Sequence, residues 1–472
     1  MARAACSLLV ALAAGGLGCG GDEPAPGLPP EPAGWDADVA LPLAEDLNGD
    51  PGILEVNLEA RLANFEFSPG VPAEVWTYDG GIPGPLLRAR VGDRLIVHFT
   101  NNLPESTTIH WHGVKVPPGM DGTIEMQPEV EPGGTFDYDF VLPEAGAFWY
   151  HPHIRSNAQV GRGLYGGLIV EDPAEPALGH EVVLILDDVL LDKDGALAPQ
   201  DSGGDLGDFF GREGNVLMVN GRVEPTLLAR PGVPQRWRLV NAANSRYFLL
   251  RIEGHTFVRI GGDGGLLEAP IESGDLLLVP GERADVLVTP QGPAGAALTV
   301  RWLPFDRGYC TDCRDPEDLF RVALDASPPW VAPPLPASLR VIPPIDTSGA
   351  MEQRVELTEQ VVDGVVVMGI NGQPFGEHAH LEAYVGDTQV WRIVNDTEAH
   401  HPFHLHGFEF QPLGIVGQAP LPLEWKDTLN IPSKSTMRIA VTFDNRPGEW
   451  MFHCHILDHQ EIGMMGMLKL MP

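Results

Sequence analysis

The sequence predicts an all-β protein built of three β-sandwich domains. Its 472 residues are enough for about three domains of ordinary size. It contains 55 glycines and 45 prolines, the residues that mark turns and loops, and short alternating apolar runs lie between them. This pattern favours sandwiches over helical folds. We expect the domains at residues 50–173, 174–330 and 352–472, with a proline-rich linker at residues 331–351.

Residues 1–19 have the features of an export signal. Arg3 supplies a positive start, and the apolar core that follows is too short to span a bilayer. The segment ends at Cys19, as in a bacterial lipoprotein signal, although Gly16 stands where such signals usually have leucine. We therefore expect export to the periplasm or cell envelope, with Cys19 as a possible lipid anchor, or otherwise secretion. Residues 20–49 are rich in proline, glycine, alanine and acid, which predicts a disordered tether.

The chain is strongly acidic, with a net charge of −35 at pH 7. A phosphate backbone would be repelled, so we expect no nucleic-acid partner. The same field could attract cations or cationic aromatic amines, or it could serve solubility outside the cell. We expect a monomer.

Two of the five cysteines are candidates for a disulfide bond. Cys310 and Cys313 lie close in the sequence, and in an oxidising compartment they are expected to form a disulfide. Acidic neighbours such as Asp312 disfavour the lowered thiol pKa that a redox-active pair needs.

Histidines in the first and third predicted domains form His-x-His pairs. In a strand, residues i and i+2 point to the same face, so each pair presents two imidazoles together. With 16 histidines, chance gives roughly 0.5 such pairs, yet the sequence has five. Four of them are candidate metal ligands: His110 and His112, His151 and His153, His404 and His406, and His453 and His455. The fifth, His378 and His380, is assigned to a surface loop.

The last pair encloses a cysteine on a predicted strand that runs into a loop. Cys454 points to the face opposite His453 and His455. His459 and Met464 follow it, and a thiolate, imidazoles and a weak axial thioether are the ligands of a blue-copper centre. The second imidazole must come from elsewhere in the chain, and His401 can supply it.

The second predicted domain has only two histidines, His180 and His255, and neither has a partner at ligand spacing. We expect it to hold no metal. Residues 237–241 (WRLVN) are echoed by residues 391–395 (WRIVN) of the third domain, which indicates homologous units.

These motifs resemble the multicopper oxidase family, in its three-domain, laccase-like, bacterial form. The resemblance covers roughly residues 50 to 472. It implies three cupredoxin-like Greek-key domains. The phrases that carry it are residues 81–88 (GIPGPLLR), 110–113 (HWHG), 148–153 (FWYHPH), 280–283 (PGER), 401–407 (HPFHLHG) and 444–450 (DNRPGEW).

The resemblance also implies four copper ions and divides the ligands among them. The type 1 copper takes His401, Cys454, His459 and axial Met464; the type 2 copper takes His110 and His404; one type 3 copper takes His112, His151 and His453, and the other takes His153, His406 and His455.

The implied reaction is one-electron oxidation of phenols or aromatic amines, or of metal ions, coupled to four-electron reduction of O2 to water. We expect electrons to enter through a partly exposed edge of His459. Two alternatives stay open: a cuprous or other metal-ion oxidase, although no methionine-rich insert is evident, and an exported copper-binding carrier.

Reduction of O2 to water also consumes protons, so acids are expected near the cluster. Asp121 matches an acidic residue that the family has beside its copper cluster. Gln460 stands where many bacterial relatives have a glutamate, and Glu461 follows it. We predict that Asp121 carries more of the proton delivery and that Glu461 carries less.

Overall fold

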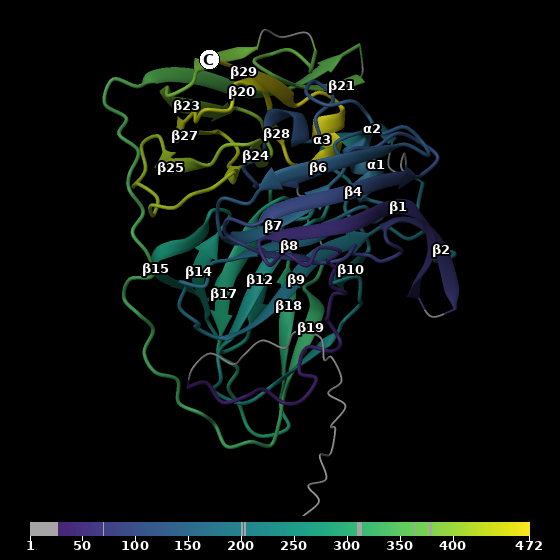
Figure 1. The fold of residues 1–472 in the computed structure, drawn as a ribbon, viewed down its shortest axis with the longest axis vertical. Helices are drawn as coiled ribbons and strands as arrows, with labels where there is room; N and C mark the ends of the chain where they lie inside the picture. Colours follow the sequence, from purple (N-terminus) through teal and green to yellow (C-terminus); the bar gives the residue numbers. More distant parts are fainter. Residues whose placement is uncertain are drawn as a thin grey trace, which may run out of the picture.

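The computed structural model describes residues 27–68, 70–199, 202, 204–308, 314–363, 365–376 and 380–472. Strands form six sheets, arranged as three β-sandwiches of two sheets each (Figure 1). The predicted all-β, cupredoxin-like fold is confirmed. Each sandwich has its own apolar core, and a separate cluster packs the first sandwich against the second.

The first sandwich consists of two four-stranded sheets, in the orders β2-β1-β4-β6 and β3-β8-β7-β5. Alternate residues of β4 are buried, as expected for a strand with one face on the core. The elements are β1 Ile53–Ser68, β2 Val71–Tyr78, β3 Leu87–Arg90, β4 Arg94–Asn102, β5 His110–His112, the 3-10 helix η1 Pro118–Met120, β6 Thr135–Val141, β7 Gly146–His151, α1 Ser156–Val160 and β8 Gly166–Glu171.

The second sandwich has a six-stranded sheet, β10-β9-β12-β17-β14-β15, and a five-stranded sheet, β11-β19-β18-β13-β16. The elements are β9 His180–Val189, α2 Gly204–Phe210, β10 Val216–Val219, β11 Thr226–Ala229, β12 Gln235–Asn241, β13 Phe248–Ile252, β14 Phe257–Gly262, β15 Gly265–Ser273, β16 Asp275–Leu278, β17 Arg283–Val288, β18 Ala297–Leu303 and β19 Glu317–Leu324.

The third sandwich has two five-stranded sheets, β21-β20-β23-β27-β25 and β22-β29-β28-β24-β26. The elements are β20 Met351–Val362, β21 Val365–Ile370, β22 Leu381–Tyr384, β23 Thr388–Asn395, β24 His401–Leu405, β25 Phe410–Ile415, β26 Thr428–Ile431, β27 Ser435–Thr442, β28 Gly448–Cys454, α3 Leu457–Glu461 and β29 Met465–Met471.

Strands β12 and β23 repeat one another in detail, as the sequence echo predicts. The indole of Trp237 donates to Gln235, and the indole of Trp391 donates to Gln389 in the same way. Both tryptophans are fully buried in their own cores. The repeat indicates that the second and third sandwiches are built on the same plan.

The first and third sandwiches each place two His-x-His motifs on neighbouring antiparallel strands. In the first, β5 pairs with β7 and sets His110 opposite His151. In the third, β24 pairs with β28 and sets His404 opposite His453. The paired strands therefore carry their imidazoles to one place in each sandwich.

The described part of the expected tether is ordered, which differs from the prediction. The Trp35 carbonyl accepts from Leu228 N at 2.7 Å, beside β11, and Val39 is buried in the second core with 1% exposure. Leu43 then forms a bridge with Leu86 of the first sandwich. Composition predicted disorder because it averages over the segment, whereas a few well-spaced apolar residues and an open strand edge are enough to hold it.

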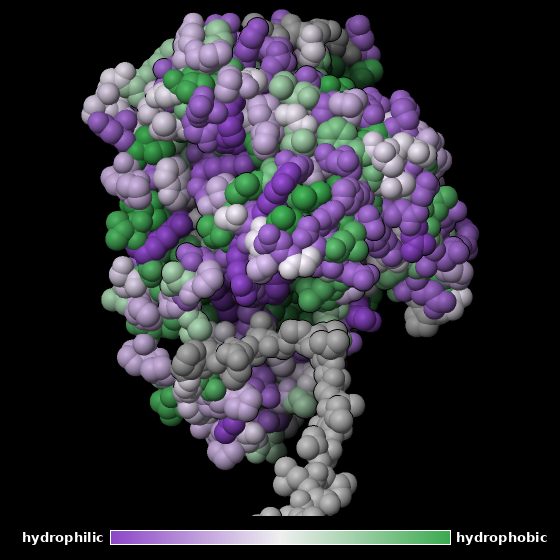
Figure 2. All heavy atoms as spheres, in the orientation of Figure 1, coloured by the Kyte–Doolittle hydropathy of each residue, from purple (hydrophilic) through white to green (hydrophobic). Residues whose placement is uncertain are grey.

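On the face that Figure 2 shows, hydrophilic residues are interspersed with hydrophobic ones over the described part of the chain. Among the described residues, no helix has the length and apolar character needed to cross a membrane.

Candidate metal centres

Cys454, at the end of β28, meets two imidazoles in the core of the third sandwich. Its sulfur lies 3.5 Å from Nδ1 of His401 and 3.7 Å from Nδ1 of His459. The two Nδ1 atoms are 3.2 Å apart. His401 begins β24, and His459 lies on the short helix α3, where the sequence predicts a loop.

The hydrogen bonds of these two rings leave their Nδ1 atoms as acceptors. Nε2 of His459 donates to the Phe209 carbonyl at 3.0 Å. Nε2 of His401 donates to the Thr397 hydroxyl at 2.9 Å, because that hydroxyl gives its own proton to Asn395. A neutral imidazole carries one N–H, so both Nδ1 lone pairs face the Cys454 sulfur. The two Nδ1 lone pairs face each other with no proton between them, and together with the Cys454 sulfur they form a set of ligand atoms that suits copper.

Met464 lies beside this group through its backbone. Cys454 N donates to the Met464 carbonyl at 3.0 Å, and Met464 N donates to the His459 carbonyl at 2.9 Å. The side chain is fully buried. An axial role for its sulfur stays a prediction.

The prediction that an edge of His459 is partly exposed is wrong. His459 is 0% exposed, because the Phe209 carbonyl of α2 covers its Nε2 edge. Phe209 lies 250 residues away in sequence, in a domain that the histidine pattern marks as metal-free. Electrons that enter through this imidazole must therefore pass α2.

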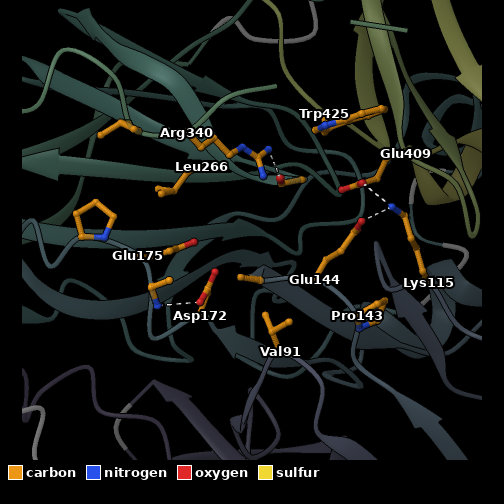
Figure 3. A pocket seen from close by; sticks show the side chains of 15 residues that line it. Val91, Lys115, Pro143, Glu144, Asp172, Glu175, Leu266, Arg340, Glu409 and Trp425 are labelled. Carbon is orange, nitrogen blue, oxygen red and sulfur yellow. Dashed lines mark hydrogen bonds and ion pairs between the residues drawn. The ribbon is translucent and has the colours of Figure 1, made fainter. Parts of the chain in front are cut away.

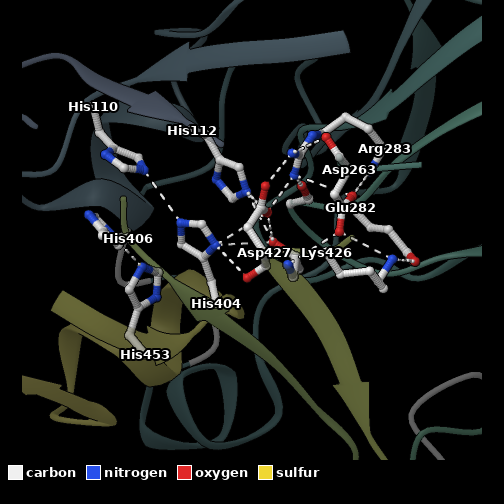
Figure 4. A network of polar contacts seen from close by, with 12 residues as sticks. His110, His112, Asp263, Glu282, Arg283, His404, His406, Lys426, Asp427 and His453 are labelled. Carbon is white, nitrogen blue, oxygen red and sulfur yellow. Dashed lines mark hydrogen bonds and ion pairs between the residues drawn. The ribbon is translucent and has the colours of Figure 1, made fainter. Parts of the chain in front are cut away.

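Eight further imidazoles gather where the first and third sandwiches meet. Figure 4 labels His110, His112, His404, His406 and His453 among them. Nδ1 of His110 donates to the Asp121 carbonyl at 2.8 Å, and Nδ1 of His404 donates to the Asp427 carbonyl at 3.0 Å. Their Nε2 atoms therefore both carry lone pairs, yet they face each other at 3.4 Å. A cation between them satisfies both.

A second group forms around His453. Its Nε2 lies 3.1 Å from Nε2 of His406 and 3.5 Å from Nε2 of His153. The ring of His455 lies instead 5.0 Å from that of His112 and 5.6 Å from that of His151. The predicted division of type 3 ligands is therefore wrong in one respect: His453 and His455 exchange places. Strand alternation puts both on one face, but it does not say which neighbour each meets.

Several ring nitrogens in this group have no hydrogen-bond partner among the described residues. They are Nδ1 of His112, Nε2 of His151 and both ring nitrogens of His455. Buried polar atoms are seldom left unpaired in native proteins. The rings thus fit a group of metal ions, and the residues present match the copper ligands that the sequence predicts.

Burial also sets the protonation of these side chains. It lowers the pKa of His112, His151, His153, His406, His453, His455 and His459 well below the usual histidine range. Burial raises the pKa of the Cys454 thiol. Neutral imidazoles are the form that binds metal, whereas the thiol must release its proton before its sulfur can bind a cation.

The two predicted acids lie in different surroundings. Asp121 is fully buried, and its carboxylate accepts from Nδ1 of His406 at 2.8 Å. Glu461, at the end of α3, accepts from Ser156 N at 2.6 Å at the start of α1. Burial raises the pKa of Glu461. The structure thus brings Asp121, but not Glu461, into contact with a predicted copper ligand.

Two residues at this site were missed by the sequence reasoning. The Asp427 carboxylate lies 3.1 Å from Nε2 of His112, and the Thr428 hydroxyl lies 3.0 Å from the same atom. They sit at the start of β26, next to β24. An Asp-Thr pair before a short strand has no spacing that points to a metal site.

The remaining predicted positions lie elsewhere. Cys310, Cys313 and His378 fall outside the described residues, so their disulfide and surface assignments stay predictions. In the second sandwich, His180 Nε2 donates to the Pro29 carbonyl and His255 Nδ1 donates to the Glu253 carbonyl. Both have ordinary structural partners.

A cavity of about 390 Å³ lies between the sandwiches and the linker (Figure 3). Lys115 Nζ contacts two carboxylates there, Glu144 at 2.5 Å and Glu409 at 3.0 Å. Burial, followed by the neighbouring Glu144, raises the pKa of Glu409 to about 7, against the opposing effect of Lys115. This cavity is lined by ionic and apolar side chains and contains no histidine.

Known proteins share this architecture. Multicopper oxidase family models match residues 59–175, 180–298 and 346–472. The chain is 32% identical to the multicopper oxidase MmcO of Mycobacterium tuberculosis over 430 residues, which covers 82% of this chain and 81% of that protein. It is 27% identical to a laccase of Bacillus subtilis over 471 residues, covering 84% and 90%. A solved multicopper oxidase of Campylobacter jejuni, described as a metallo-oxidase, superimposes with a TM-score of 0.83 at 28% identity, covering 92% of this chain and 94% of that one.

Proposed function

This chain belongs to the multicopper oxidase family, and from that premise we propose that it is a laccase-like enzyme. It takes single electrons from phenols and aromatic amines, and it reduces O2 to two waters with four electrons and four protons. Bound copper would supply the one-electron carriers and the centre at which O2 is reduced.

The observation that carries this proposal is the convergence of lone pairs at two separate places. His401, His459 and Cys454 converge in the third sandwich. His110 and His404 face each other between the first and third sandwiches. One site suits electron entry and the other suits a multi-ion cluster, which is the arrangement that four-electron chemistry needs.

Cys454 links the two sites through the backbone. It is bonded directly to His453 and His455, whose Cα atoms lie about 3.8 Å from its own. Its side chain points toward His401, whereas His453 points toward His153 and His406. An electron that arrives at Cys454 therefore has a short covalent route to the imidazole cluster.

The chain's own acids would orient the cluster and supply protons. Asp121 receives the hydrogen bond of His406 and so fixes that ring with Nε2 toward His453. Its carboxylate is also the nearest predicted proton carrier. Glu461 would serve as a weaker carrier, since its observed contact is with Ser156.

A second candidate is a metal-ion oxidase. It is favoured by the cover over His459, because α2 leaves no open imidazole edge on which an aromatic ring could stack. The Campylobacter jejuni structure is also described as a metallo-oxidase.

Parallel turnover assays separate the two candidates. Copper-loaded protein should be blue and should consume O2 with a phenol or an aromatic amine at a higher kcat/KM than with Cu(I) or Fe(II). The reverse ranking favours the metal-ion oxidase. A colourless copper-loaded protein that consumes no O2 with any of them overturns both.

We also propose that the enzyme works outside the cytoplasm, in the periplasm or cell envelope, as a monomer. The support for export is the sequence of residues 1–19, which lie outside the described residues. Cell fractionation of the full chain tests export, and Cys19→Ala tests the anchor, because this variant should appear in the soluble fraction if Cys19 is lipidated.

A further inference from the structure

We propose that the metal-free second sandwich sets the geometry of the imidazole cluster through Arg283, a positioning residue at the start of β17. The proposal rests on the proposed function, since it concerns how the predicted copper ligands are held. It gives the second sandwich a part in the copper chemistry, although the sandwich provides none of the predicted ligands.

The Arg283 side chain contacts all three sandwiches. Its Nε donates to the Ala147 carbonyl of β7 in the first sandwich at 3.1 Å, and its Nη2 donates to the Asp263 carbonyl in the second at 3.3 Å. Nη1 donates to Oδ1 of Asp427 at 2.7 Å, and Nη2 donates to Oδ2 of the same carboxylate. Because both carboxylate oxygens are held, the Asp427 plane cannot turn.

The held carboxylate in turn orients imidazoles. Oδ1 of Asp427 accepts from Nε2 of His112 at 3.1 Å and from the Thr428 hydroxyl at 2.8 Å. With its proton fixed on Nε2, His112 directs the lone pair of Nδ1 to the cluster, where Nδ1 has no partner among the described residues. His404 has the opposite tautomer: its Nδ1 carries the proton and donates to the Asp427 carbonyl, so the lone pair is on Nε2.

Further charged side chains hold Arg283 on the side away from the imidazoles (Figure 4). Lys426 Nζ lies 3.1 Å from Asp263 and 2.7 Å from Glu282, and Asp263 also contacts Arg283 at 3.3 Å. Arg283 and Asp263 have side chains that are 0% exposed. Buried ion pairs seldom add net stability over apolar packing, so a network of this size is better explained by the orientation that it imposes.

The backbone leaves room for the network. Gly113 follows His112 with a φ of +86°, and a Cβ there would lie 2.7 Å from Oδ2 of Asp427. Gly281, with a φ of +83°, lies two residues before Arg283, and its Cβ would lie within 3.0 Å of the His455 ring. Residues without side chains thus stand where the second sandwich approaches the cluster.

The test compares Arg283→Lys with Arg236→Lys in the full, copper-loaded chain. Lysine keeps the charge but cannot hold both oxygens of Asp427. Arg236, on the neighbouring strand β12, pairs with Asp285 and Glu175, so its variant disturbs a comparable buried ion pair away from the imidazoles. Three quantities are measured: copper affinity by chelator competition, the EPR spectrum of the type 2 copper, and the blue absorbance of the type 1 copper.

We expect Arg283→Lys to weaken copper binding at the cluster about 10- to 100-fold and to change the type 2 EPR spectrum. Its blue absorbance should equal that of the unmodified protein, and Arg236→Lys should match the unmodified protein in all three. The inference is overturned if Arg283→Lys keeps its affinity and EPR spectrum, or if both variants change alike.

A second variant covers the case in which Arg283→Lys does not fold. Asp427→Asn keeps the size of the side chain but weakens the charged hydrogen bonds to Arg283 and His112, and it should change the same two cluster measurements. An unchanged cluster in this variant overturns the inference. If the unmodified protein itself binds no type 2 copper, the proposed function fails, which is a separate result.

Discussion

His110 of the first sandwich and His404 of the third face each other across the domain boundary, with their Nε2 atoms 3.4 Å apart. Each ring has already given its only N–H to a backbone carbonyl, of Asp121 and Asp427 respectively. The two facing atoms are therefore both acceptors, and they repel each other unless a cation lies between them.

Removal of metal should consequently destabilise the junction between these sandwiches. At a free copper concentration about 1,000 times Kd, binding would stabilise the folded protein by about 4 kcal/mol. Chelation should lower the thermal unfolding temperature, and added copper should restore it. Equal unfolding temperatures with and without copper would contradict this account of the facing imidazoles.

Cys454→Ser should abolish the blue absorbance and the oxidase activity, because its sulfur is the thiolate donor that faces His401 and His459. The type 2 EPR signal should persist, since His110 and His404 are unaffected. The double variant of Cys310 and Cys313 to serine is the control and should remain blue. A blue Cys454→Ser protein would remove this cysteine from the site.

The faces on which the predicted copper ligands lie could be read from the sequence, because strand alternation puts i and i+2 side chains on one face. This places His110 with His112 and separates Cys454 from His453. It does not determine which ring of the first sandwich His453 meets, because that depends on how two separate sandwiches dock. For this reason the prediction assigned His453 and His455 to each other's groups of imidazoles.

Contacts between segments that are distant in the sequence could not be predicted, because they produce no periodic pattern of residues. Phe209 covers His459 through a backbone carbonyl, which any residue type provides. Arg283 lies in a sequence motif typical of the family, but its partner Asp427 is 144 residues away, so the motif does not reveal the pair. Trp35 and Val39 order a segment whose composition predicts disorder. Local pattern predicts elements and their faces, whereas these features arise from tertiary packing.

Stability should fall as the pH rises toward neutrality because of Glu409. Its pKa is raised from the ordinary value of 4.5 to about 7, by burial and by Glu144, although Lys115 opposes the shift. Between these pH values the folded protein binds a proton that the unfolded chain has lost, so the free energy of unfolding decreases with pH. Glu409→Gln should remove up to about 3 kcal/mol of this decrease.

Unfolding midpoints at pH 4.5 and pH 7.5 measure this effect. The midpoint of Glu409→Gln should vary less between the two pH values than that of the unmodified protein. Glu131→Gln, at an exposed carboxylate, is the control and should leave the pH dependence unchanged. Parallel behaviour of Glu409→Gln and the unmodified protein would remove Glu409 as the cause.

Asp121→Asn should slow reoxidation of the reduced enzyme by O2 by about 100-fold, the usual contribution of a positioned acid, because an amide cannot deliver a proton. Reduction at the type 1 copper should stay near normal, since Asp121 contacts His406 of the cluster. Glu461→Gln is the matched comparison and should have a smaller effect. Stopped-flow measurement of both half-reactions would refute the role of Asp121 if its amide variant reoxidises at the normal rate.

The most direct test of the central claim is the number of electrons that each O2 molecule receives. Copper-loaded protein is supplied with excess phenol in an oxygen electrode, and O2 consumed, phenol oxidised and peroxide formed are measured together. If the cysteine site feeds a cluster that completes the reduction to water, four one-electron oxidations accompany each O2 and no peroxide appears. Two oxidations per O2 with an equivalent of peroxide, or no consumption of O2, would contradict the account.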